Sequence, residues 1–467
     1  MPNSLLKLRI RVVLSLVDLT VENTKLIFPS TIVEAGLAIE NGKIVKIAKD
    51  VNLPRADLRL NCRGLLTFPG VIDSHVHFRD PGLTYKEDFS TGSMAAAAGG
   101  VTMVVDMPNT MPPLVDSESF KTKVEAVKGK SYVDYGFLAL LSSENVNKVS
   151  KLAGILGFKL FMADFSRKPV TDDFLFNAFN VIKNLGLPVA IHAENPEDVL
   201  VLTEKVKHEG KKDIYAYTSA RPGYVEAKAI IRVASISEKV GIKIHICHVS
   251  SREGIKVLSE IKGRGFKNIT CETCPHYLLL SIEELNPALT AFKVTPPLKF
   301  RHDAEALWKG VNDGVIDTIA SDHAPHTHNE KFKNDVWEAS SGFIGVETLV
   351  PLMLTQVVDG RLNLNQFTKL LCENPAKVYG LYPLKGCIKV NSDADLTIVK
   401  LGVEEKIKAS KLHSKTGFTP FDGWTVKAKP VYTIVRGMVI MENGEIVGKP
   451  EGKLVKPINK NLHPSNH

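Results

Sequence analysis

The chain has 467 residues, of which 44% are apolar and 24% charged, a composition typical of globular proteins that argues against disordered, collagen-like and membrane-spanning chains. Its 59 basic and 51 acidic residues give a net charge of +8, a bias too small over this length to indicate a nucleic-acid or membrane partner. The apolar run at 12–17 is too short for a membrane anchor, so we expect a cytoplasmic protein.

Short β-rich runs separated by turn residues occupy both ends of the chain. They are 11–21, 32–39 and 43–48 near the N-terminus, and 394–400 and 431–441 near the C-terminus. Asn-Gly pairs, which favour tight hairpins, stand at Asn41-Gly42 and Asn443-Gly444. We therefore predict antiparallel β structure at both ends, around a middle part of different character.

The middle part alternates nearly continuous apolar runs with helical stretches, a pattern typical of parallel strands covered on both faces. The eight runs are 71–77, 101–108, 132–141, 158–162, 189–194, 243–250, 269–276 and 317–325. The clearest helices are 118–128, 172–185, 224–240 and 253–261.

Eight strand–helix repeats close a (β/α)₈ barrel. The rival is a doubly wound open sheet, which is disfavoured because no Gly-rich phosphate-binding loop follows any strand. The predicted fold class is α/β, with a (β/α)₈ TIM barrel over 68–379 and a small β-sandwich domain built from 1–67 and 380–467.

The six cysteines are irregularly spaced, so we expect free thiols rather than a disulfide framework. Cys271 and Cys274 form a C-x-x-C, but no second pair accompanies them, as a structural zinc site would require. A buried strand is the preferred interpretation of this segment.

The active site of such a barrel lies at the C-terminal ends of its strands, and five of the eight predicted strands carry a metal ligand or a base there. These residues are His75 and His77, Lys159, His192 with Glu194, His248, and Asp322 with His323. Side chains two residues apart share a face of a strand, so the H-x-H pair offers two imidazoles to Zn²⁺ or a similar ion. The alternative, two histidines that merely cap a strand, is disfavoured by the candidates on the other strands.

Strand six contains two histidines, and alternation separates them. His248 is expected to share a face with Ile244 and Ile246, whereas His245 shares the other face with Cys247. We choose His248 as the site residue because it is nearer the end of the strand. His245 is expected to be a packed or helix-facing histidine.

Lys159 is the unusual member, since a lysine inside a barrel is costly unless it is paired or neutral. A neutral amine can react with carbon dioxide to form a carbamate, whose two oxygens can bridge two cations. The alternative is an ion pair with an acid such as Asp322.

The segment F-P-G-V-I-D-S-H-V-H at 68–77 resembles the opening of the cyclic amidohydrolases, two-metal barrel enzymes. The resemblance extends over nearly the whole chain and includes Asn374-Pro375-Ala376 and Asp393-Ala394-Asp395-Leu396. It implies two Zn²⁺ ions per chain, carboxylation of Lys159 by CO₂, and the metal ligands His75, His77, Lys159, His192, His248 and Asp322. The same residues emerge from the strand ends.

Within this family two motifs are similar to those of dihydroorotases. H-V-H-F-R at 75–79 contains their H-x-H-x-R, and M-P-N-T at 107–110 matches their M-P-N-T. S-D-H-A-P-H at 321–326 resembles their D-H-A-P-H. The resemblance implies that substrate is held by Arg79, Asn109 and His326, with backbone groups near Ser341 and Gly342.

An Arg fork suits the ring carboxylate of dihydroorotate, a group that allantoin and simple hydantoins lack. The alternative is that Arg79 only pairs with an acid such as Asp80. Three segments depart from the dihydroorotase pattern. Thr295 stands where many dihydroorotases have Asn, and 192–195 and 273–277 look more like allantoinase or hydantoinase.

The resemblance thus implies reversible hydrolysis of the cyclic amide of dihydroorotate to N-carbamoyl aspartate, a step of pyrimidine biosynthesis. A hydroxide bridging two zinc ions would attack, and Asp322 would move the proton. The alternatives are an allantoinase or hydantoinase with the same metals, and a non-catalytic relative, which retention of all six ligand types disfavours. We expect a small-molecule substrate, and a homo-oligomer is compatible with the sequence.

Overall fold

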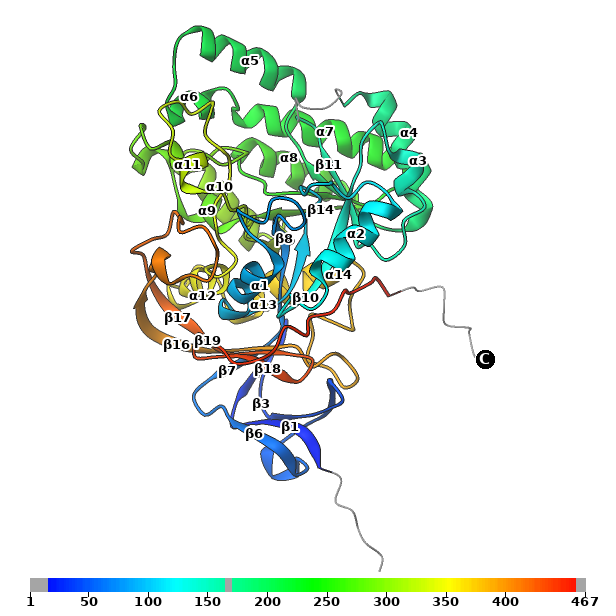
Figure 1. Ribbon diagram of the computed structural model, residues 1–467, viewed down its shortest axis with the longest axis vertical. Helices are drawn as coiled ribbons and strands as arrows, with labels where there is room; N and C mark the ends of the chain where they lie inside the picture. The colour runs from blue at the N-terminus through cyan, green and yellow to red at the C-terminus, as the bar shows by residue number, and fades with distance from the viewer. Residues whose placement is uncertain (1–15, 164–169, 459–467) are drawn as a thin grey trace, which may run out of the picture.

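The computed structural model describes residues 16–163 and 170–458 (Figure 1). Its central sheet has eight parallel strands, each hydrogen-bonded to the next along the chain. They are β8 (Val71–Val76), β9 (Val101–Asp106), β10 (Asp134–Leu140), β11 (Gly157–Phe161), β12 (Val189–His192), β13 (Ile244–Ile246), β14 (Ile269–Thr273) and β15 (Thr318–Ile319). A bridge between Val76 and His323 joins the two edges. The predicted α/β barrel is confirmed.

Helices cover the outside of this sheet (Figure 1). The longer ones are α1 (Phe89–Ala98), α2 (Ser117–Val127), α4 (Asp172–Ile182), α5 (Pro196–His208), α7 (Gly223–Val240), α8 (Arg252–Gly263), α10 (Arg301–Asn312) and α12 (Leu349–Val358). Shorter ones are α3 (Val146–Val149), α6 (Ile214–Ser219), α9 (Pro275–Leu279), α11 (His328–Lys331), α13 (Leu364–Thr368) and α14 (Asn374–Val378). Polar N-caps begin several of them: Asp116, Thr171 and Ser251 each accept a hydrogen bond from a backbone N–H of the first turn, which satisfies a donor that the helix leaves free.

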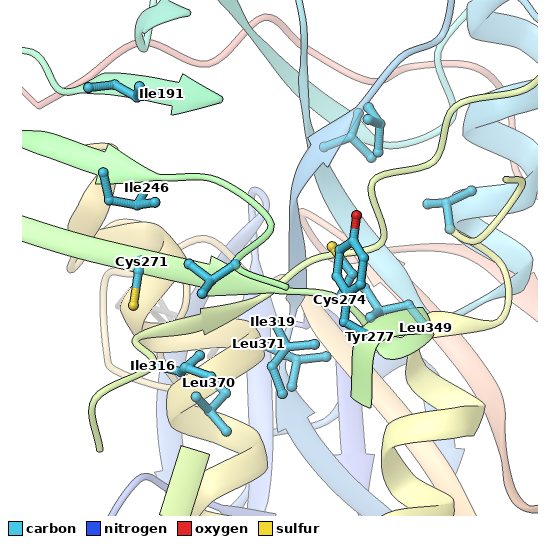
Figure 2. Packing of buried hydrophobic residues seen from close by; sticks show 14 of the residues in the cluster. Ile191, Ile246, Cys271, Cys274, Tyr277, Ile316, Ile319, Leu349, Leu370 and Leu371 are labelled. Atoms are coloured by element: carbon cyan, nitrogen blue, oxygen red, sulfur yellow. The ribbon is translucent and has the colours of Figure 1, made fainter. Parts of the chain in front are cut away.

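The layer between strands and helices is apolar, and Figure 2 shows part of it, with Ile191 and Ile246 beside Cys271. A second apolar cluster fills the barrel itself and includes Met103, Leu138 and Cys247. Ile246, the last residue of β13, therefore faces the helices, whereas Cys247, which follows it, lies inside the barrel.

Two further sheets form the small domain. The four-stranded sheet has the order β5-β4-β1-β6, and the seven-stranded sheet has the order β19-β18-β17-β16-β7-β2-β3. Their bounds are β1 (Val17–Glu22), β2 (Lys25–Ile27), β3 (Ile32–Glu34), β4 (Gly36–Glu40), β5 (Lys43–Ala48), β6 (Ala56–Asn61), β7 (Leu66–Pro69), β16 (Leu396–Lys406), β17 (Thr425–Val435), β18 (Met438–Glu442) and β19 (Glu445–Ile446). One apolar cluster joins both sheets, with Leu19 and Ile39 from the first and Leu396 and Ile434 from the second. The seven-stranded sheet lies between the barrel and the four-stranded sheet (Figure 1).

Two predicted strands are each divided in the structure. The run 32–39 becomes β3 and β4, which belong to different sheets. Its two halves therefore pair with different strands, β3 with β2 and β4 with β1 and β5. The run 431–441 is interrupted at Arg436-Gly437, where φ is 46° and 76°, left-handed values that end a strand. Residues 11–15 of the first predicted strand lie outside the described residues. Both Asn-Gly pairs have the positive φ that a tight hairpin turn requires.

All six cysteines fall within the described residues and are free. Cys271 lies in β14 and Cys274 precedes α9, both fully buried. Among the residues that the structure describes, no helix is long and apolar enough to cross a membrane.

One buried lysine joins the barrel to the small domain. The ammonium of Lys385 lies 2.7 Å from Asp134, at the start of β10, and 3.0 Å and 2.6 Å from Asp393 and Asp395, which precede β16. Arg436 pairs with Asp134 as well. The three carboxylates could be taken for a cation site, but the lysine already occupies the place of the cation.

We expect Lys385→Met to destabilise the protein by about 3–5 kcal/mol, because it leaves buried carboxylates without their main partner. Urea unfolding followed by circular dichroism measures this change. Lys25→Met is the matched control, since Lys25 forms an exposed pair with Glu34 in the same domain and such pairs contribute little. Equal unfolding midpoints for the two variants would contradict the prediction.

Candidate active site

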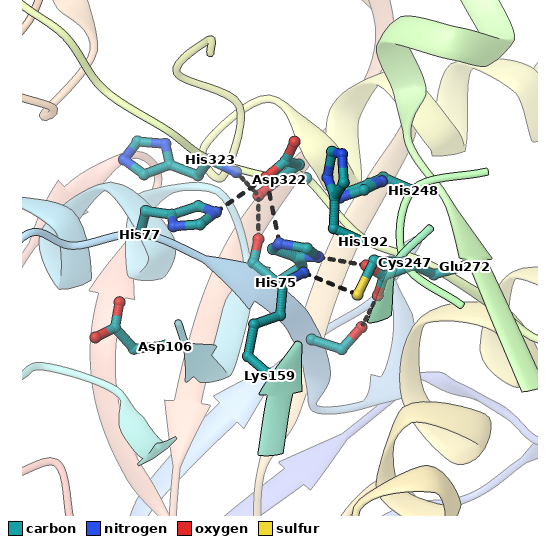
Figure 3. A network of polar contacts seen from close by, with 12 residues as sticks. His75, His77, Asp106, Lys159, His192, Cys247, His248, Glu272, Asp322 and His323 are labelled. Atoms are coloured by element: carbon teal, nitrogen blue, oxygen red, sulfur yellow. Dashed lines mark hydrogen bonds and ion pairs between the residues drawn. The ribbon is translucent and has the colours of Figure 1, made fainter. Parts of the chain in front are cut away.

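The C-terminal end of β8 and the segment after β15 bring three ligand candidates together (Figure 3). Nε2 of His75 and Nε2 of His77 lie 3.4 Å and 3.2 Å from Oδ1 of Asp322. All three side chains are buried, and one ligand atom from each falls within 4.8 Å of the others. The H-x-H pair and the aspartate, 245 residues apart in the chain, therefore meet at one point.

A second pair of ring nitrogens lies beside this group. Nδ1 of His192 is 3.2 Å from Nε2 of His248, and the rings of His248 and His75 have centroids 5.3 Å apart. Lys159 points from β11 toward the same space (Figure 3), and its Nζ donates a hydrogen bond to Sγ of Cys247 at 3.0 Å. Among described residues it forms no ion pair, with Asp322 or any other acid.

The backbone is strained at three of the residues that the sequence predicts for the site. Arg79, His248 and Asp322 have φ values of 60°, 37° and 48°, in the left-handed region that side chains with a Cβ rarely adopt. Such strain persists only where surrounding structure enforces it, and it gathers at functional sites.

The positive φ also explains how His248 reaches the site. The expected alternation is wrong at this residue, because β13 ends at Ile246 and Ile246 faces the helices, whereas His248 faces the barrel. His245 is packed as expected, but inside the barrel, with Nε2 3.1 Å from Oε2 of Glu272.

Glu272 of β14 is a functional candidate that the strand-end argument missed. Its carboxylate accepts a hydrogen bond from Nδ1 of His75, which leaves Nε2 of that ring free to bind a metal. The signal was present in the sequence, since a glutamate inside a buried apolar run requires a partner.

Glu194 does the same for His192. Its Oε2 lies 2.7 Å from Nε2 of His192 and accepts a hydrogen bond from Arg221 at 2.5 Å, so Nδ1 of His192 remains free. Burial raises the pKa of Glu194, but Arg221 and His192 lower it to about 2. The carboxylate stays ionised and fixes the ring.

Two of the site histidines are held neutral, whereas the protonated form is favoured for His75. Burial lowers the pKa of His77 to about 3 and holds that of His248 well below its usual value, so both rings are neutral, the form that binds a metal. Burial and Lys159 lower the pKa of His75, but the carboxylates of Glu272 and Asp322 raise it to about 10. The carboxylates of Glu272 and Asp322 thus favour a positive charge at the position of His75.

The four histidines and Asp322 form a ligand set that suits divalent cations. Imidazole nitrogens and a carboxylate are ordinary ligands for zinc and similar ions, and for two of the four histidines the far nitrogen is held by a carboxylate. The site is therefore a candidate divalent-metal centre.

Arg79 and His326, two of the residues expected to hold substrate, lie in contact with each other. Nη2 of Arg79 is 3.3 Å from Nε2 of His326, and Ser341 accepts a hydrogen bond from Thr295 at 2.8 Å. The N–H of Gly342 donates to the carbonyl of Lys293, and contact of substrate with the backbone near Ser341 and Gly342 stays a prediction. Oδ1 of Asn109 is buried without a hydrogen-bond partner among the described residues.

The sequence of the chain matches the amidohydrolase family over residues 66–447. It is 39% identical to a dihydroorotase of Methanosarcina acetivorans, over 93% of this chain and 94% of that protein. It is 35% identical to an allantoinase of Rubrobacter xylanophilus, over 91% and 94% of the two chains. An L-hydantoinase structure from Arthrobacter aurescens superposes with a TM-score of 0.90 at 34% identity, over 93% of this chain and 98% of that one.

Proposed function

The chain belongs to the amidohydrolase family and is a cyclic amide hydrolase, and from this premise we propose that its substrate is dihydroorotate. The reaction is reversible hydrolysis of the ring amide to N-carbamoyl aspartate, in pyrimidine biosynthesis. Its action in the cytoplasm stays a prediction from the sequence.

The observation that carries this proposal is the state of Arg79. Its guanidinium is buried, with 8% of the residue exposed, and it forms no ion pair with a described carboxylate. Its Nε has no hydrogen-bond partner among those residues. The neighbouring Asp80 is paired with Lys130 instead, at 2.9 Å. A buried unpaired cation is costly, so an anionic group of the substrate is the expected partner.

One observation favours a neutral ring. Thr295 joins Ser341 and the hydroxyl of Tyr217 in a chain of hydroxyl groups, at 2.8 Å and 2.5 Å, where many dihydroorotases have an amide. The second candidate function is therefore allantoinase or hydantoinase, with the same metal centre.

We further propose that the centre binds two zinc ions and that Lys159 is carboxylated, in which case His75, His77, His192, His248, Asp322 and the Lys159 carbamate would hold the ions. When bound, such ions lower the pKa of a water molecule and polarise the ring carbonyl. Asp322 accepts the proton of the attacking water and delivers it to the leaving ring nitrogen. Burial raises the pKa of Asp322, but His75 and His77 lower it below its ordinary value, so the carboxylate is ionised.

Arg79→Met tests the choice of substrate. We expect kcat/KM for dihydroorotate to fall by about 10–10² or more, because each charge-assisted hydrogen bond to the carboxylate is worth roughly 1.5–3 kcal/mol. Turnover of allantoin and of a 5-substituted hydantoin should change much less, since neither carries that carboxylate.

Steady-state kinetics on metal-replete protein with the three substrates measures this difference. Arg59→Met is the control, because Arg59 pairs with Glu22 on the small domain, remote from the centre. A wild-type preference for a neutral ring, or equal losses on all three substrates, would contradict the dihydroorotate assignment.

A further inference from the structure

Lys86, in the loop between β8 and α1, is buried beside the substrate residues without having been assigned to them. Its Nζ lies 2.7 Å from Oε1 of Glu330 and 3.2 Å from Nδ1 of His326. Glu330 is itself held in place by the N–H and hydroxyl of Thr327, at 2.9 Å and 3.0 Å. The ammonium of Lys86 is therefore fixed against the imidazole.

His326 is flanked by two cations that can only donate hydrogen bonds, and the acceptors near its ring include the backbone of Ser341 and Oε2 of Glu330, 3.8 Å from Nδ1. Lys86 faces its Nδ1, and Nη2 of Arg79 faces its Nε2 at 3.3 Å. Burial, together with these two charges, lowers the pKa of His326 to about 2, so the ring is neutral. A neutral imidazole accepts a hydrogen bond through only one of its two nitrogens. In the free protein, either Lys86 or Arg79 therefore faces a ring nitrogen that cannot accept its hydrogen bond.

We propose that Lys86 is a positioning residue that fixes the Nε2–H tautomer of His326 when substrate binds. Lys86 donates to Nδ1, so the ring proton must reside on Nε2. Nε2–H and the Arg79 guanidinium are then two donors 3.3 Å apart that converge on one acceptor. A carboxylate supplies two acceptor oxygens for such a pair of donors.

This inference rests on the proposed function, because it makes the anionic group of the substrate the missing acceptor. The inference adds that Nε2 of His326 donates to the substrate only while Lys86 donates a hydrogen bond to Nδ1 of the same ring. Were Lys86 merely the partner of Glu330, its removal would lower stability and affect every substrate alike.

The test compares Lys86→Met with Lys86→Arg, which retains a donor near Nδ1. We expect Lys86→Met to raise KM for dihydroorotate about tenfold, the loss of one charge-assisted hydrogen bond, with kcat changed by less than about threefold. Lys86→Arg should recover most of this loss, and KM for a neutral hydantoin should not change in either variant. Lys262→Met is the control, since Lys262 forms a similar partly buried pair with Asp317.

A second measurement needs no variant and remains decisive if Lys86→Met fails to fold. NMR of wild-type protein with ¹⁵N-labelled histidine, saturated with the equilibrium mixture of dihydroorotate and N-carbamoyl aspartate, reports which nitrogen of His326 carries the proton. We expect Nε2–H. An Nδ1–H ring, or a folded Lys86→Met protein with unchanged KM, would overturn the inference alone. Wild-type protein that hydrolyses hydantoins but not dihydroorotate would overturn the proposed function, and this inference with it.

Discussion

Asp322→Asn is expected to lower kcat by about 10²–10⁴, the contribution of a general acid–base group, while the fold and much of the bound metal remain. The carboxylate is buried against His75 and His77, and in the proposed mechanism it accepts and returns the proton. An amide of the same shape keeps an oxygen toward the histidines but cannot accept a proton at neutral pH.

Steady-state kinetics and elemental analysis of the same preparation separate loss of chemistry from loss of metal. Asp317→Asn is the matched control, because Asp317 precedes the same strand, β15, and pairs with Lys262 at the opposite end of the barrel. We expect near-normal kcat from this control. Near-normal kcat from Asp322→Asn would assign the proton transfer to another group.

Lys159→Ala is expected to remove most of the metal and, with it, the activity. Wild-type protein should carry close to two divalent ions per chain. Lys159 is fully buried and points between the two groups of histidines (Figure 3), where a carbamate would supply anionic oxygens to both. Bicarbonate with a short-chain carboxylic acid should restore part of the activity, because the small acid can occupy the space of the missing side chain.

Elemental analysis and turnover of dihydroorotate, with and without the added acid, measure this effect. Lys123→Ala is the control, since Lys123 is equally buried but pairs with Asp106; we expect it to lower stability and to keep the metal. Full metal content and activity in Lys159→Ala would show that this lysine is structural. Activity of wild-type protein that contains no metal would contradict the metal mechanism as a whole.

The features that were predicted correctly from the sequence are those set by interactions between residues close together in the chain. The eight apolar runs correspond to eight strands, because a strand buried on both faces must be apolar along its length. The Asn-Gly pairs adopt left-handed turns because few other residues tolerate positive φ. His75 and His77 meet the same partner because residues two apart in a strand share a face.

The tertiary structure decided what depends on chain segments that are distant in sequence. Alternation could not place His248, because the strand ends before it and the left-handed backbone reorients its side chain. Glu272 reaches His75 across 197 residues, a contact set by the register of the closed barrel rather than by any local pattern. The run 32–39 divides between two sheets because each half finds a different neighbour.

The sequence by itself thus determined the barrel, the small β domain and the residue types gathered at the strand ends, since periodicity and turn preference act within a few residues. Which nitrogen of each histidine is free was decided only in the folded chain. Glu272 and Glu194 hold the far nitrogens of His75 and His192, and Lys86 faces Nδ1 of His326. The physical reason is that a tautomer follows from hydrogen-bond partners. For His75 and His326 these partners come from separate strands and loops that only barrel closure brings together, whereas Glu194 lies two residues from His192 and needs only the local strand end.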